Sequence, residues 1–147
     1  MAEVTRPARW HSERGAELIE MVVVLPLLLL VLFGIIDFGF MFQRYVVLTN
    51  AAMEGARVGI LPGYALDDAE DRATSYATNG GVPGVVNAVA TNTAVDEPDG
   101  TPWPAVQVVV THNYTYDYIG PILSMFGGSM SSSTLTARAV MRKQSPS

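Results

Sequence analysis

Two carboxylates border the most apolar stretch of the chain, and their chemistry raises the first question about the protein. Residues 21–36 are all apolar, Glu20 precedes them directly and Asp37 follows them. An ionised carboxylate at membrane depth requires a cation, hydrogen-bond donors or water, and an acid in such a place is a functional residue by default. Glu20 and Asp37 are therefore the first candidate functional residues, and each needs a partner.

The remaining polar residues do not form a catalytic or metal-binding set. The chain has no cysteine, which excludes thiol nucleophiles, thiolate metal sites and disulfides. His112 is the only histidine of the carboxy-terminal part, and no acid, base and nucleophile accompany it, so we expect it to pack in or on a sheet. We predict no enzyme activity, no metal, no cofactor and no small-molecule substrate.

Two acidic clusters, DDAED at residues 67–71 and DEPDG at residues 96–100, have simpler explanations than a metal site. The acids of the first cluster stand where a helix begins, and there they suit the helix dipole. The second cluster combines proline and glycine, as hairpin turns do. Neither has the alternating spacing of a calcium loop, and calcium binding is left as the lesser alternative at both.

The composition of the chain indicates a membrane protein and excludes a nucleic-acid binder. Hydrophobic residues make up 49% of the 147 residues, while the nine Lys and Arg are scattered in a chain of net charge −5. At about 1.5 Å per residue, a helix over residues 21–42 would be roughly 33 Å long, enough to cross a hydrocarbon core of about 30 Å. A soluble core helix this apolar would need a larger domain around it. We therefore predict one membrane-spanning helix.

The distribution of arginines predicts the direction of this span. Arg6, Arg9 and Arg14 precede it, whereas only Arg44 follows it closely. The positive-inside rule then leaves the amino terminus in the cytoplasm and exports the remainder. An ordinary secretory signal, cleaved near residues 49–51, is the lesser alternative because the apolar run is longer than such signals have.

The sequence from Arg14 to Arg57 resembles a known family. The segment RGAELIEMVVVLPLLLLVLFGIIDFG, followed by LTNAAMEGARVG, is similar to the TadE-like minor pilins, or pseudopilins, of the bacterial Tad (Flp-type, tight-adherence) pilus. The family pattern falls on Gly15, Glu20, Leu25-Pro26, the Gly34–Gly39 step that contains Asp37, and Thr49–Arg57, with Met21 where many relatives carry phenylalanine. The resemblance implies an inner-membrane protein, cut by a prepilin peptidase after Gly15, that assembles with other pilins and Tad assembly proteins.

Such a cut would give Glu20 a partner. It would create an ammonium group on Ala16, four residues before Glu20 and so one helical turn away. In related pilins the acid is thought to pair with the amino terminus of a neighbouring subunit, which would fix the register between packed helices. The alternative is that Glu20 is solvated among lipid headgroups.

Pro26 and Asp37 are further candidate assembly residues. Pro26 removes a backbone donor, so we expect a kink or local unwinding there, which neighbouring helices in a filament could accommodate. For Asp37 we expect either solvation at headgroup level or a contact with a partner helix, for example with Arg44 of another subunit.

The first helix should extend over residues 16–60 and present a narrow packing face. Ala51, Gly55 and Gly59 recur every fourth residue, which lets another helix or a sheet come close. Pro62 and Gly63 should end this helix. A second helix is expected from Asp67 or Asp68, as its cap, to Gly80, packed through Ala69, Ala73 and Tyr76.

Alternating patterns predict strands at residues 85–95, 105–118 and 132–142, with a short apolar turn over residues 119–126. We expect an α+β fold in which three or four antiparallel strands lie against the outer part of the first helix. The predicted organisation is a leader at residues 1–15, a transmembrane and assembly helix at 16–60, and an exported domain at 61–147.

Two functions compete at this point. The first is a structural minor pilin, since roughly ninety residues follow Arg57, whereas the major subunits of this system are little more than the helix. The second is an uncleaved, signal-anchored protein whose outward domain binds a surface as an adhesin would. The amino terminus of the mature chain separates them.

Overall fold

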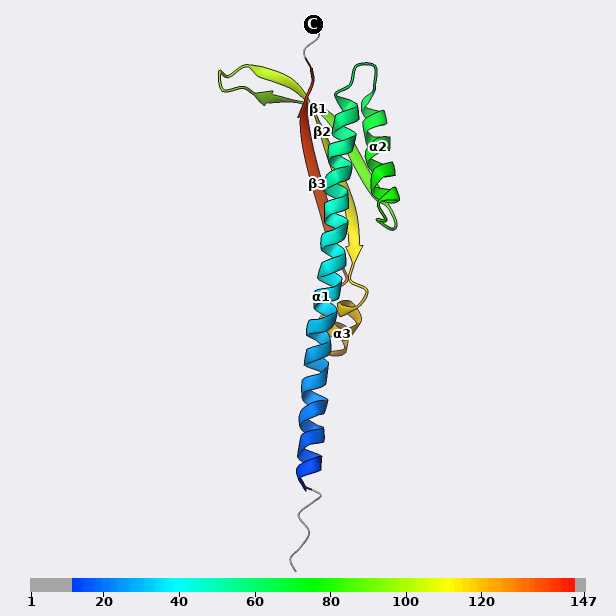
Figure 1. Ribbon diagram of the computed structural model, residues 1–147, viewed down its shortest axis with the longest axis vertical. Coiled ribbons are helices and arrows are strands. Elements are labelled where there is room, and N and C mark those ends of the chain that lie inside the picture. Colours follow the sequence, from blue (N-terminus) through cyan, green and yellow to red (C-terminus); the bar gives the residue numbers. More distant parts are fainter. Residues whose placement is uncertain (1–11, 145–147) are drawn as a thin grey trace, which may run out of the picture.

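The computed structural model describes residues 12–144, and one helix runs through most of its length (Figure 1). This helix, α1 (Ser12–Gly59), has 48 residues and remains continuous across Pro26. It ends before the Leu61-Pro62-Gly63 break, where Gly63 has a φ of +88°, a conformation that side chains disfavour. α1 is the one helix among the described residues that is long and apolar enough to cross a membrane, which indicates a single-pass membrane protein.

Three strands form one antiparallel sheet in the order β1-β2-β3. They are β1 (Val86–Asp96), β2 (Pro102–Thr115) and β3 (Ser132–Arg142). The DEPDG segment connects β1 to β2 as a turn, in which the Gly100 amide donates to the carbonyl of Glu97 at 2.9 Å. The α+β fold with a three-stranded antiparallel sheet is therefore confirmed.

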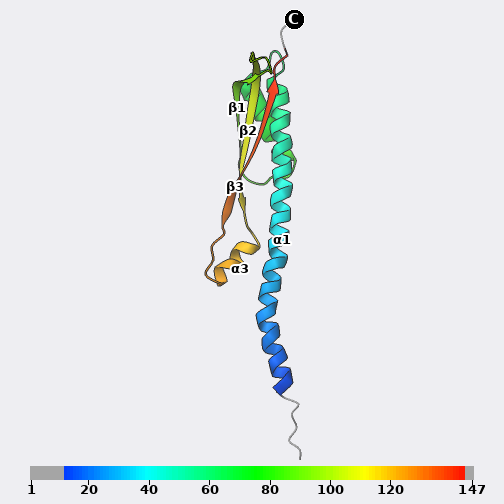
Figure 2. The same ribbon diagram turned by 90° about the vertical axis from the view of Figure 1, so that its left-hand side faces the viewer.

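Helix α2 (Leu66–Asn79) pairs with the upper half of α1, and both helices lie against one face of the sheet (Figures 1 and 2). The core is built from small side chains and valines, because two helices and a sheet can approach closely only where side chains are small. Its fully buried members include Leu48, Ala51, Ala52, Ala56, Ala69, Ala73, Ala77, Val106, Val108 and Val110. The carboxy-terminal third of α1 thus forms one packed unit with α2 and the sheet. We call this unit the head.

Two details of α2 differ from the prediction. The cap residue is Ala65, so the expected Asp67 or Asp68 cap is wrong; Asp68 instead accepts a hydrogen bond from the Ala65 amide at 2.8 Å from within the first turn. Tyr76 is 38% exposed, and Ala77 is buried in its place. The buried alanines recur every fourth residue because the close contact with α1 admits no aromatic ring.

The segment after β2 is a helix, α3 (Ile119–Met125), and not the apolar turn that we expected. β2 ends at Thr115, so Tyr118 lies outside the strand and is exposed. In Figures 1 and 2, α3 lies beside the middle of α1, below the sheet. Its seven residues are too few for a helical period to be recognised in the sequence.

Candidate assembly surface

The predicted processing site lies near the first turns of α1. Gly15 and Ala16 are helical and exposed, and a side chain added at Gly15 would meet nothing within 4 Å. The predicted leader therefore ends within α1 instead of at its boundary. Residues 1–11 of that leader lie outside the described residues.

Glu20 is exposed on the same part of the helix. Among the residues that the structure describes, none donates a hydrogen bond to its carboxylate. Its position one turn after Ala16 follows from helical geometry, since residues four apart lie on one face. Among the described residues, the Glu20 carboxylate thus remains open to a partner.

The first half of α1 exposes apolar side chains on every side except the one that α3 contacts. Figure 1 shows that this part extends below the sheet and α2. Exposed residues on it include Leu18, Ile19, Met21, Val22, Val23, Leu27, Leu28, Val31 and Ile35. An exposed apolar surface of this extent marks a membrane or protein contact.

Asp37 is buried inside the chain's own fold. It is 1% exposed, and its Oδ2 accepts hydrogen bonds from the amides of Ile119 at 2.6 Å and Tyr118 at 3.2 Å. The Tyr114 hydroxyl donates to the Asp37 carbonyl at 2.9 Å. The expectation that Asp37 is solvated among lipid headgroups is therefore wrong, because the start of α3 covers its carboxylate and donates hydrogen bonds to it.

Arg44 also contacts its own chain. Its guanidinium lies 4.6 Å from the centre of the Tyr114 ring, in a cation–π arrangement. Burial raises the pKa of Tyr114, and the nearby Asp37 carboxylate raises it further, while Arg44 opposes them. Within the chain, Arg44 and Asp37 thus each contact Tyr114, and the expected contact of Asp37 with Arg44 of another subunit stays a prediction.

Pro26 does not interrupt α1, so the expected local unwinding is absent. Together with Leu30 and Phe126, it lines an apolar hollow of about 400 Å³ between α1 and the end of α3. Pro26 thus lies where the lower end of α3 meets the span.

The small-residue face of α1 is closed by the rest of the head. A side chain on Gly55 would come within 2.7 Å of the Ala69 carbonyl, and one on Gly59 within 2.8 Å of Val106. Ala51 is fully buried beside them. In the folded chain, this face is occupied by α2 and β2 and contributes nothing to the exposed apolar surface.

A family model recognises the amino-terminal part of the chain. The model described as TadE-like protein matches residues 15–57. This match confirms the resemblance to the TadE-like family. The match covers most of α1 and none of the sheet. It supports an association of this protein with the Tad pilus. The TadE-like family consists of structural components of that pilus and is not a family of enzymes. No curated protein and no solved structure matches the chain.

Sequence reasoning missed the partners of Asp37. Tyr114, Tyr118 and Ile119 are about eighty residues away along the chain, and no local pattern connects them with the acid. The one signal in the sequence was the free-energy cost of an unpaired carboxylate in an apolar setting, which implies that hydrogen-bond donors lie near Asp37 in the folded chain. Between residues 15 and 144, no three His, Cys, Asp or Glu residues gather in a way that could hold a metal ion.

Proposed function

We propose that this protein is a minor pilin of a Tad-type pilus. In this proposal, a prepilin peptidase removes residues 1–15 on the cytoplasmic face of the inner membrane, and the mature chain assembles through α1 with other pilins. The observation that carries the proposal is the TadE-like match, which begins at Gly15 and continues along the exposed apolar half of α1.

The geometry around the processing site supports this order of events. Gly15 is the weakest helix former of the first turns, with a helix propensity about 1 kcal/mol below that of alanine, so the helix opens there most easily. Cleavage would convert the Ala16 amide into an ammonium group one turn from Glu20. The exposed Glu20 carboxylate would then have a cation within reach, on its own chain or on a neighbour.

The head suits a minor subunit. The sheet and α2 cover the upper half of α1 on one face, while α3 alone lies beside the lower half (Figure 1). Neighbouring helices can therefore pack against the lower half without disturbing the head. A subunit with such a head would begin or cap a filament more readily than repeat along it.

The amino terminus of the membrane-extracted protein tests the proposal. We expect sequencing and intact mass to give a chain that begins at Ala16 in cells with the prepilin peptidase and at Met1 in cells without it. A mature chain that still begins at Met1 in the presence of the peptidase would contradict the proposal and would favour the uncleaved, adhesin-like alternative.

A substitution at the cleavage site gives the matched control. Gly15→Leu should block processing, because the peptidase requires a small residue there, while the exposed position leaves the fold intact. Gly39→Leu changes another exposed helical glycine with no atom within 4 Å and should be processed normally. Equal processing of the two variants would argue against a cut at Gly15.

A further inference from the structure

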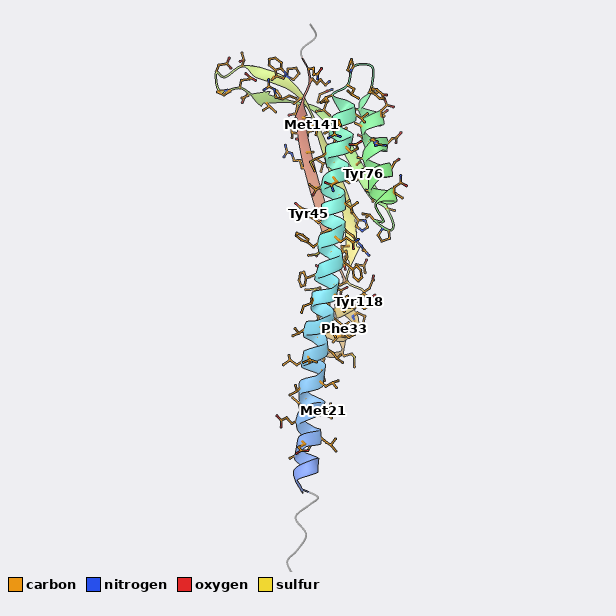
Figure 3. The ribbon with its side chains drawn as sticks, viewed as in Figure 1. Met21, Phe33, Tyr45, Tyr76, Tyr118 and Met141 are labelled. Carbon is orange, nitrogen blue, oxygen red and sulfur yellow. The ribbon has the colours of Figure 1, made fainter. Side chains whose placement is uncertain are left out.

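Helix α3 lies beside the part of α1 that is expected to cross the membrane. The amides of Tyr118 and Ile119 bond to Asp37, and the Ile119 Cδ1 lies 3.4 Å from where a side chain on Gly34 would begin. The rings of Phe33 and Tyr118 are stacked, with centroids 6.1 Å apart (Figure 3). The start of α3 is thus fixed next to α1 inside the apolar stretch of residues 21–42.

The other end of α3 reaches further into this stretch. Phe126 shares an apolar hollow with Pro26 and Leu30 of α1. From Asp37 to Leu30, the axis of α1 advances about 10 Å. If residues 21–42 fill the hydrocarbon layer, then α3 lies within the leaflet on the side of the sheet.

The end of α3 exposes apolar side chains. Met125 is 82% exposed and Phe126 is 65% exposed, which equals or exceeds the exposure of Leu28 on the bare part of α1 at 64%. Exposing these side chains to water is unfavourable, whereas contact with acyl chains would bury them. Phe126 adjoins Pro26 and Leu30, so this surface meets the apolar surface of α1.

The backbone at the start of α3 is prepared for an apolar environment. Hydrocarbon offers no hydrogen bonds, so amides and carbonyls at that depth must be paired within the protein. The amides of Tyr118 and Ile119 are paired with Asp37. Pro121 has no amide hydrogen to pair. The usual unpaired donors of a helix start are therefore largely absent here.

The end of α3 is paired as well. The amides of Phe126 and Gly128 both donate to the carbonyl of Leu123, at 3.0 and 2.9 Å, and the amide of Gly127 donates to Ser124. The Ser124 hydroxyl donates to the carbonyl of Pro121 at 2.6 Å. The Leu123 and Ser124 carbonyls, which a helix end normally leaves to water, are thus satisfied by the turn itself.

We propose that α3 enters the bilayer beside α1, with Met125 and Phe126 in contact with lipid acyl chains. The head is then held in the membrane by two segments, the spanning helix and this short second element. Asp37 lies between them, and its carboxylate is the polar link that joins α3 to the span. The proposal requires α1 to be inserted but does not depend on processing or on pilus assembly.

Fluorescence quenching in vesicles tests the proposal. Because the chain has no cysteine, Met125→Cys, Leu28→Cys and Tyr64→Cys each carry a single thiol for an NBD label. Leu28 represents the lipid-facing span, and Tyr64 is an exposed residue beyond the far end of α1. Each labelled full chain is reconstituted into phosphatidylethanolamine–phosphatidylglycerol vesicles that contain acyl-chain nitroxide lipids, without any other pilin.

We expect the label at position 125 to lose its fluorescence to the same extent as the label at position 28, while the label at position 64 keeps it. Phe126→Cys should repeat the result at the neighbouring position. A label at 125 that behaves like the one at 64 would overturn the proposal. Absence of quenching at position 28 would overturn insertion of α1, and the proposal with it.

Discussion

Asp37 is the residue on which the placement of α3 depends. Its carboxylate is buried and takes two backbone donors from the start of α3. Asp37→Ala would leave both amides without an acceptor, and a buried unsatisfied group costs about 1–3 kcal/mol. We therefore expect a loss of unfolding free energy of about that size, measured by thermal or denaturant unfolding in detergent micelles.

Two comparisons separate this effect from a general loss of charge. Asp37→Asn keeps one acceptor oxygen and should lose less stability than Asp37→Ala. Asp117→Ala removes an exposed carboxylate and should change stability by no more than about 0.5 kcal/mol. Equal stabilities for Asp37→Ala and Asp117→Ala would show that the contact with α3 does not contribute.

Glu54 makes stability depend on acidic pH. Its carboxylate receives hydrogen bonds from Arg72 at 2.8 and 3.3 Å and pairs with Arg57 at 3.3 Å. The hydrogen bond from Arg72, supported by the charges of both arginines, lowers the pKa of Glu54 below its ordinary value of 4.5. The folded state thus binds this proton less readily than the unfolded state, so the contribution is complete above pH 4.5 and disappears as pH falls below it.

We therefore expect Glu54→Gln to reduce the unfolding free energy at pH 7 by about 0.2–1 kcal/mol, the range for partly exposed pairs. The difference from wild type should shrink as the pH of the unfolding experiment falls from 4.5 toward 3. Asp71→Asn, at an exposed position of α2, provides the control. A difference that persists unchanged at pH 3 would contradict the assignment.

At the scale of elements, the contact between α1 and α2 depends on the absence of side chains. A methyl group on Gly55 would lie 2.7 Å from the Ala69 carbonyl and 2.9 Å from the Ala73 Cβ. Backbone cannot move aside as a flexible side chain can, and overpacking costs about 1–3 kcal/mol. Gly55→Ala should lower the unfolding free energy by that amount, as measured by denaturant titration.

Gly39→Ala is the matched change on the same helix. An added methyl group there meets nothing within 4 Å, and alanine favours a helix over glycine by about 1 kcal/mol. We expect this variant to be at least as stable as the wild type. If Gly55→Ala were equally stable, the close approach of α2 to α1 would be wrong.

Elements with long, regular patterns were predictable from the sequence, and the short one was not. In residues 132–142, exposed side chains alternate with less exposed ones, because one face of β3 packs on the helices and the other does not. The predicted strand has the observed bounds. The face of β2 with His112 and Tyr114 is also buried as its alternation indicated. α3 has one buried residue, Ile119, and its position depends on a contact outside its own segment. No local period could reveal it.

At the scale of the whole molecule, the candidate site also has a part that local sequence predicts and a part that depends on long-range contacts. Gly15 and Glu20 are proposed from local sequence, because the roles proposed for them depend on residues one turn apart. Asp37 was found as an acid in an apolar setting, but its partners follow from how β2 brings the chain back to α1. Long-range contacts of this kind leave no spacing to read in one sequence.

Assembly is a property of the whole molecule, and Glu20 tests it. Glu20→Ala should leave membrane insertion and folding intact, because the side chain is exposed and outside the head. If its carboxylate pairs with an amino terminus, we expect the variant to be missing from complexes with other pilins, as measured by co-purification after crosslinking. Glu17→Ala removes a neighbouring exposed acid and should co-purify normally. Normal incorporation of Glu20→Ala would contradict the pairing.

The unbroken course of α1 has a mechanical consequence. Its backbone hydrogen bonds continue from Ser12 to Gly59, and its last third is locked into the sheet and α2. No linker separates the two parts, so a displacement of the lower turns is passed to the head through helical backbone. The head is therefore not free to rotate independently of the lower part of α1, and its orientation follows from how the lower turns are held by their neighbours.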